Sequence, residues 1–143
     1  MDIKKINMLY DKDNEIGYEN LLKLEKLSLE TNEVYQYIDE FIKMLDNEKT
    51  FIRVRGFRLI CIQAKWDKEN KINNNIEKVL LELDDEKPTA VRQCLASLKY
   101  LLIYKKELLT DIKNKLEKIN YMKYKDTMQG LIKKDINNIL EKN

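Results

Sequence analysis

The chain of 143 residues contains no histidine, two cysteines, one proline and three glycines. Without histidine, the Ser-His-Asp and Cys-His arrangements of nucleophilic enzymes cannot form. The isolated glycines, Gly17, Gly56 and Gly130, exclude a glycine-rich phosphate loop. Two cysteines without histidine are too few for a structural zinc or iron–sulfur site. We therefore expect no metal, no cofactor and no enzymatic activity.

The cysteines and the absence of a long apolar run indicate a compartment. Cys61 and Cys94 lie among apolar residues at helical spacing, which favours buried, reduced thiols over a disulfide. The N-terminus lacks the apolar segment of a secretion signal, and no later window approaches the about eighteen apolar residues of a membrane span. We expect a cytoplasmic protein that does not bind membranes.

The scarcity of glycine and proline removes most hairpin turns, while 43% of the residues are hydrophobic and 36% are charged. Apolar residues recur at the 3.6-residue period of a helix, so the fold class is all-α. The expected helices cover residues 16–30, 33–45, 51–66, 70–83, 88–104, 107–119 and 124–141. We expect Thr50 to cap the third helix and Pro88 to lie in the first turn of the fifth.

Charge is distributed unevenly along the chain. Residues 1–50 carry 7 Lys and Arg against 12 Asp and Glu, whereas residues 99–143 carry 11 against 6. An elongated molecule with this sequence would be electrically polar from end to end, although solvated helix faces explain surface charge as well.

The expected helices alternate in character. Residues 51–66 and 88–104 are apolar nearly all round, whereas 33–45, 70–83 and 107–119 show one apolar stripe. A helix that is apolar all round must be covered on several sides. Stacked helix pairs provide that cover, because one helix of each pair contacts its partner and both neighbouring pairs.

An internal repeat supports stacking. A shift of 37 residues places Val54-Arg55 on Val91-Arg92, and the acidic connectors LDNEKT (45–50) and LDDEKP (83–88) precede the two copies. This period predicts an α-α superhelix, a short right-handed solenoid. We expect one domain over residues 1–143, with units at 16–46, 50–84 and 88–120 and a partial unit at 124–143.

The two central copies, NEKTFIRVRGFRLI (47–60) and DEKPTAVRQCLASL (85–98), resemble HEAT repeats. Together with RGFRLICIQAKWD (55–67) and YKDTMQGLIKKDI (124–136), they are similar to small HEAT-like proteins of low-GC Gram-positive bacteria, some labelled as SufBD-type iron–sulfur assembly proteins. The lack of cysteine and histidine ligands argues against a cluster in this chain.

The resemblance implies a structural role for the repeated arginines. In HEAT repeats the corresponding arginine bonds to the acidic turn or the neighbouring repeat, so Arg55 and Arg92 are expected to pair there. The candidate partners are Asp46, Asp84 and Asp85. Gly56 costs about 1 kcal/mol in a helix relative to Ala, so we expect another helix to approach it closely.

The remaining unusual residues are candidates for binding. Residues 51–66 hold four basic groups and no acid. Arg53, Arg58, Lys65, Trp66 and Asp67 could form a basic, aromatic-edged surface for an acidic protein segment or a nucleic-acid backbone. The structural alternative is that Trp66 packs over the next loop and the cations pair with neighbouring acids.

A second candidate surface follows from the resemblance, because second helices line the concave face of HEAT arrays. It comprises Asn73, Asn74, Glu77, Lys78, Lys113, Asn114 and Glu117. The expected function is a non-enzymatic adaptor for a protein or peptide partner. The first alternative is a nucleic-acid binder, which requires Arg58, Lys65, Lys125 and Lys134 on one continuous face.

Two further interpretations stay open. Some HEAT-like proteins are DNA glycosylases, and Trp66-Asp67 beside the arginines matches their residue types. A second copy of the chain could cover the outer faces of the terminal repeats.

Overall fold

The computed structural model describes residues 1–143 and is all-α, with no strand. Its α-helices are α1 (Ile3–Asn7), α2 (Gly17–Glu30), α3 (Ile38–Met44), α4 (Thr50–Ile62), α5 (Lys71–Asn74), α6 (Ile76–Leu81), α7 (Pro88–Tyr104), α8 (Leu109–Lys118) and α9 (Asp126–Lys142). Six 3-10 helices accompany them: η1 (Met8–Tyr10), η2 (Glu33–Tyr37), η3 (Ala64–Trp66), η4 (Glu82–Asp84), η5 (Lys106–Leu108) and η6 (Tyr121–Lys123).

The long helices agree with the sequence pattern, but one of the residues predicted at their N-terminal ends does not have the predicted role. Pro88 lies in the first turn of α7, as predicted. The prediction that Thr50 caps α4 is wrong, because Lys49 is the N-cap residue and makes no side-chain cap bond. The Thr50 hydroxyl instead accepts a hydrogen bond from Nη2 of Arg53 at 3.0 Å.

The predicted helix 70–83 is broken into α5, α6 and η4. The break lies at Asn75, whose backbone leaves the helical region at φ −119° and ψ 18°. Its side-chain amide donates to the carbonyl of Lys71 at 2.7 Å. Asparagine competes with the helix in this way because its short amide reaches nearby backbone groups.

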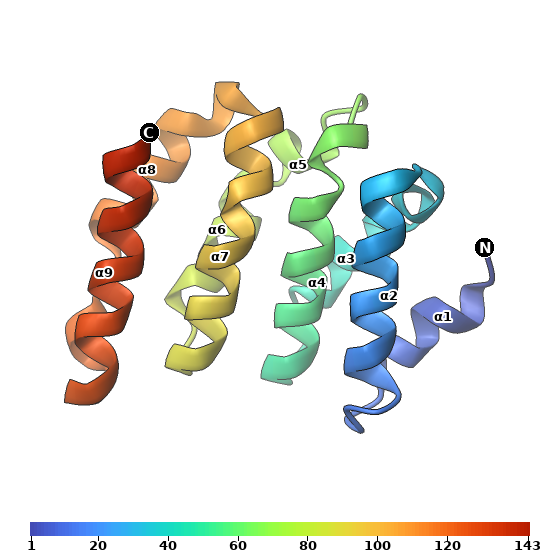
Figure 1. Cartoon of the computed structure of the whole chain (residues 1–143), viewed down its shortest axis with the longest axis horizontal. Helices are drawn as coiled ribbons and strands as arrows, with labels where there is room; N and C mark the ends of the chain where they lie inside the picture. The colour runs from blue at the N-terminus through green and yellow to red at the C-terminus, as the bar shows by residue number, and fades with distance from the viewer.

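The longer helices lie side by side in one row. Figure 1 shows α2, α4, α7 and α9 in this order, with all four beginning at the lower end. α4 contacts both α2 and α7, and α7 contacts α9. The shorter helices α3, α6 and α8 form a second layer behind the row. The two apolar segments of the repeat are therefore neighbours.

One continuous core joins both layers, formed by 35 buried apolar residues. α4 is apolar nearly all round because α2, α3 and α7 cover it. A Cβ at Gly56 would lie 2.8 Å from Cβ of Met44 and 2.9 Å from the carbonyl oxygen of Phe41, both on α3. The close approach predicted for Gly56 is therefore confirmed.

No helix of this protein is long and apolar enough to cross a membrane. Cys61 and Cys94 are both buried and unbonded, on α4 and α7. Burial raises the pKa of both thiols, which disfavours the reactive thiolate.

Candidate binding surface

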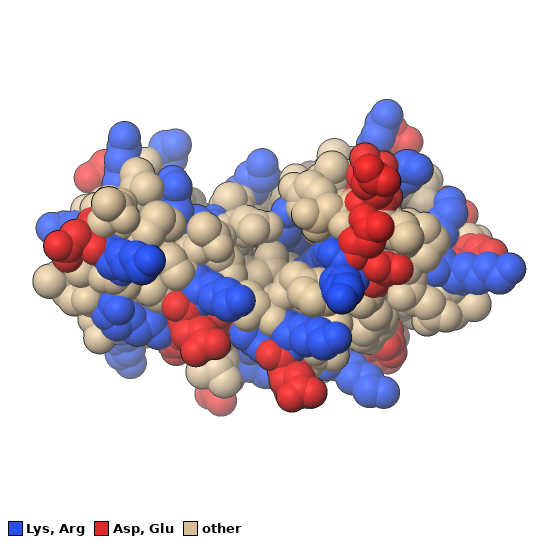
Figure 2. Space-filling model, turned by 90° about the horizontal axis from the view of Figure 1, so that it is seen from below, with Lys and Arg blue, Asp and Glu red and all other residues tan.

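Three grooves open on the face formed by α2, α4, α7 and α9. The lower groove, of about 630 Å³, lies at the N-terminal ends of α2, α4 and α7. The central groove, of about 430 Å³, lies farther along the same three helices. The lateral groove, of about 510 Å³, separates α7 from α9. Figure 2, which looks onto the end where these helices begin, shows the molecule hollowed between its two ends.

This grooved face is more basic than the chain as a whole. Its cationic lining residues are Lys26, Lys49, Arg55, Arg58, Lys87, Arg92, Lys99 and Lys142, and its acidic ones are Glu25, Glu48, Glu86 and Asp135. Eight cations against four acids give a local excess of four, although the whole chain carries a net charge of only +2. The grooved face therefore concentrates positive charge.

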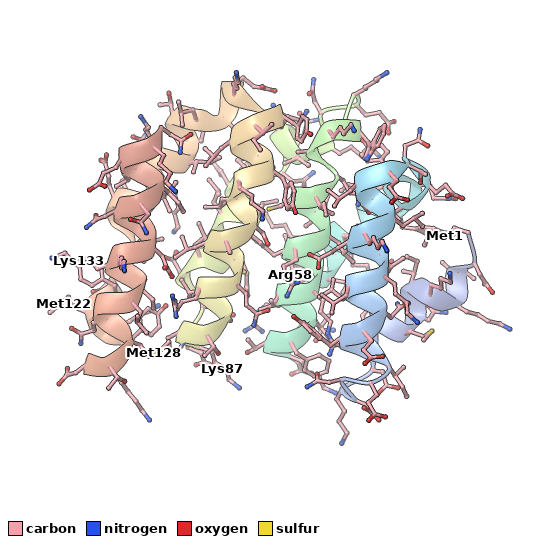
Figure 3. The ribbon with its side chains drawn as sticks, in the orientation of Figure 1. Met1, Arg58, Lys87, Met122, Met128 and Lys133 are labelled. Atoms are coloured by element: carbon pink, nitrogen blue, oxygen red, sulfur yellow. The ribbon has the colours of Figure 1, made fainter.

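Arg58 is the one predicted binding residue that lines a groove. Figure 3 shows it near the middle of α4 on the near face. Its Nη2 contacts a carboxylate oxygen of Glu25 at 2.7 Å, and its Nη1 donates to Oε1 of Gln93 at 3.0 Å. Its guanidinium also lies 5.4 Å from the centre of the Tyr18 ring. Arg58 therefore joins α2, α4 and α7 across the central groove.

Arg53 does not reach the grooved face. Its Nη2 donates to Asp85 at 2.7 Å, and its Nε donates to Glu82 at 3.1 Å. It also bonds to the carbonyl of Asn47. Arg53 thus ties α4 to the acidic turn that precedes α7, which is the role expected for Arg55.

The acids predicted as partners of Arg55 and Arg92 are wrong, although Arg92 does bond to the segment 124–143 that was expected as its neighbouring unit. Arg55 donates to the carbonyls of Leu9 and Asp11, whereas Arg92 pairs with Asp135 of α9 at 2.7 Å. The predicted acids have other partners: Asp46 binds Lys78, Asp84 binds Lys115 and Asp85 binds Arg53. Residues 53 and 55 point about 200° apart on a helix, so only one of them can face the acidic turn.

Lys65, Trp66 and Asp67 line none of the three grooves. Lys65 is exposed and lies 4.8 Å from the centre of the Trp66 ring. The indole N–H of Trp66 donates to the carbonyl of Ser28 at 2.7 Å. The expected aromatic edge of a binding surface is therefore packed against the end of α2.

Asp67 is buried and structural. It accepts hydrogen bonds from the hydroxyl of Tyr35 at 2.6 Å and from the backbone N–H groups of Lys71 and Ile72 at 3.0 Å. Nζ of Lys105 lies 3.1 Å from Oδ2 of Asp67, the oxygen that also accepts from Ile72. Desolvation, together with the bond to Asp67, raises the pKa of Tyr35.

The second candidate surface lies on the other layer. Asn73, Asn74, Glu77, Lys78, Lys113, Asn114 and Glu117 belong to α5, α6 and α8, and none lines the three grooves. Asn73 donates to Glu107 at 2.9 Å, and Lys78 pairs with Asp46 at 2.5 Å. The grooves lie instead between α2, α4, α7 and α9. Long helices packed side by side leave grooves between their ridges of side chains.

The lysines at the ends of the grooves were missed by the sequence analysis. Lys49 and Lys87 occupy the same position in the two acidic connectors, 45–50 and 83–88, and both line the lower groove. Figure 3 shows Lys87 at the foot of α7. The matching acidic connectors already aligned these lysines, but only the packing of α4 on α7 places them in one groove.

The chain matches no family model, no curated protein and no solved structure. No group of three or more His, Cys, Asp or Glu side chains is placed to hold a metal ion.

Proposed function

We propose that this chain is a HEAT-like solenoid of helix pairs that acts as a non-enzymatic adaptor in the cytoplasm. Its grooved face binds an acidic segment of a partner protein. The observation that carries the proposal is the charge of this face. Once Arg58 pairs with Glu25 and Arg92 pairs with Asp135, six cations remain there without an ion pair, against two acids.

The apolar lining of the grooves also supports a protein partner. Leu29, Ile62 and Tyr100 line the central groove beside Lys26 and Lys99. These apolar side chains and the two lysines together fit a segment that alternates apolar and acidic side chains. The row of packed helices presents this surface preformed, so binding requires little ordering of the protein.

A nucleic acid is the second candidate, because the excess of cations favours any polyanion. Of the four cations expected for it, Arg58 lines a groove, whereas Lys65, Lys125 and Lys134 line none of the three. Lys65 follows the C-terminal end of α4, whereas Lys125 precedes the N-terminal end of α9. In Figure 1 the C-terminal end of α4 is at the top of the row and the N-terminal end of α9 is at the bottom. A glycosylase activity has no support, because the Asp67 carboxylate is buried and fully engaged.

Selection from a random peptide library against the whole chain tests the proposal. We expect acidic peptides with interspersed apolar residues. The charge-reversal variant Lys26→Glu/Lys99→Glu should lower the affinity for the selected peptides about tenfold or more. Lys43→Glu/Lys118→Glu is the matched control, because both lysines are exposed on the second layer, and it should bind as the unmodified chain does.

Two outcomes would contradict the adaptor function. Equal effects of the two charge reversals would show that net charge, not the grooved face, governs binding. Tight binding of a short oligonucleotide, with an affinity that falls steeply with salt, would favour the nucleic-acid function instead.

A further inference from the structure

The lower groove combines the N-termini of α4 and α7, where the only carboxylate that accepts a backbone N–H bond is Asp85, from Lys87 at 2.9 Å. α4 and α7 begin after Lys49 and Lys87, neither of which makes a side-chain cap bond, and neither helix has an acid in its first turn. The other helices of ten or more residues, α2, α8 and α9, each have one. Helix N-termini are normally stabilised by such negative groups because their N–H groups and dipole are positive.

A buried guanidinium lines the same groove. Arg55 is only 3% exposed, and its Nη1 donates to the carbonyls of Leu9 and Asp11 at 2.9 and 2.5 Å. Its Nε and Nη2 have no hydrogen-bond partner, and Arg55 forms no ion pair with any carboxylate. A buried charge without a directly paired carboxylate is costly, so an anion at this edge would be favoured.

The surroundings of Arg55 increase its need for an anion. A Cβ at Gly17 would collide with the guanidinium, which places this cation against the N-terminal end of α2, where the helix dipole is also positive. Burial lowers the pKa of Arg55, opposed by the charge of Asp11. The guanidinium carbon of Arg55 lies 4.8 Å from the centre of the Phe51 ring.

We propose that the lower groove binds a carboxylate of the partner segment, with the Nε–Nη2 edge of Arg55 as its bidentate donor and Lys49 and Lys87 at the rim. This inference rests on the proposed function, since it names the anchor point of the acidic segment. The free backbone N–H groups of the first turns of α4 and α7 line the same groove.

The features of the groove favour a carboxylate over a phosphate. Nε and Nη2 form the side of the guanidinium that matches two carboxylate oxygens. Glu48 and Glu86 also line the groove and would repel a dianion more than a monoanion. Leu21 and Val54 provide an apolar wall. The partner residue is therefore an Asp or Glu next to an apolar side chain.

Titration of the isotope-labelled whole chain with a short peptide tests the inference. The probe is a blocked tetrapeptide of alternating Leu and Glu, and its neutral counterpart has Gln in place of Glu. We expect the acidic peptide to shift the amide signals of Thr50, Phe51 and Thr89 and the Nε–H signal of Arg55. The Gln peptide should leave these signals unchanged.

Two variants measure the cationic contribution. Lys49→Gln/Lys87→Gln should lower the affinity for the acidic peptide about tenfold, since each lysine is a solvent-exposed charge near the bound carboxylate. Arg55→Lys keeps the charge but loses the bidentate edge, and it should weaken binding at least as much. The lysine pair remains informative if Arg55→Lys fails to fold, because Lys49 and Lys87 are exposed. The control Lys43→Gln/Lys118→Gln should not change the affinity.

Other outcomes separate this inference from the proposed function. If the acidic peptide shifts signals of the central or lateral groove alone, the carboxylate anchor is wrong and the adaptor function stands. If no groove responds to the peptide, both fail. If inorganic phosphate or a short oligothymidylate shifts Arg55 and the two helix starts more strongly than the peptide, the choice of a carboxylate is wrong.

Discussion

Asp67 and Lys105 meet in a buried ion pair, with Nζ of Lys105 3.1 Å from the carboxylate and 2.8 Å from the carbonyl oxygen of Asp67. The two residues are 38 positions apart and are 3% and 4% exposed. Asp67 follows η3 at the end of α4, and Lys105 follows α7. The pair therefore locks the C-terminal ends of two neighbouring helices of the row.

Removal of one partner of this pair should be strongly destabilising. Asp67→Ala leaves the Lys105 ammonium buried without its counter-ion, so we expect the free energy of unfolding to fall by about 3–5 kcal/mol. Urea denaturation followed by circular dichroism measures the loss. The double variant Asp67→Asn/Lys105→Met removes both charges and should lose less than Asp67→Ala. A loss below about 1 kcal/mol for Asp67→Ala would contradict the role assigned to this pair.

Two glycines in helices should respond in opposite directions to alanine. Gly56→Ala forces α4 away from Met44 and the Phe41 carbonyl, and overpacking of this kind costs about 1–3 kcal/mol. Gly130 in α9 is exposed, and a methyl group added there would meet no atom within 4 Å. Gly130→Ala should therefore stabilise the protein by about 0.5–1 kcal/mol. Thermal unfolding of both variants measures the difference, and similar shifts in both would show that the packing on α3 is not tight.

Stability should fall as pH rises above about 5, because of Glu82. Desolvation, together with the neighbouring Asp85, raises the pKa of Glu82 to about 8 from the ordinary 4.5. Between these values the folded protein holds a proton that the unfolded chain has released, so the free energy of unfolding decreases with pH. We expect a decrease on the order of 1–3 kcal/mol between about pH 5 and 9. Chemical denaturation at several pH values measures this slope.

Glu82→Gln isolates the contribution of this carboxyl group. The variant cannot ionise, so its stability should change much less over the same pH range. Glu86→Gln is the control, because Glu86 is exposed and should leave the slope unchanged. A Glu82→Gln protein with the same pH slope as the unmodified chain would assign the proton to another group.

Much of the helical framework could be predicted from periodicity, because the apolar stripes are long and regular. The N-terminal helix α1 and the break at Asn75 could not. α1 is only five residues long, and the Asn75 break depends on a side-chain bond to Lys71 that has no apolar signature. The periodic pattern predicts helices but does not register local competition for backbone groups.

The candidate site was harder to predict than the helices. The repeat placed Arg55 and Arg92 at equivalent positions, but their partners differ. Arg55 of α4 bonds to the N-terminal segment, whereas Arg92 of α7 bonds to α9. Lys49 and Lys87 resembled ordinary solvated lysines. Their significance depends on two helix starts lying side by side, which is a property of the packing.

Hydrogen–deuterium exchange of the whole chain, with and without a selected acidic peptide, tests most directly whether the grooved face of α2, α4, α7 and α9 is the binding surface. We predict slower exchange at the start of α4, at the start of α7 and along the adjoining turns of α2. Protection confined to α5, α6 and α8, with no change in α4 and α7, would contradict the account.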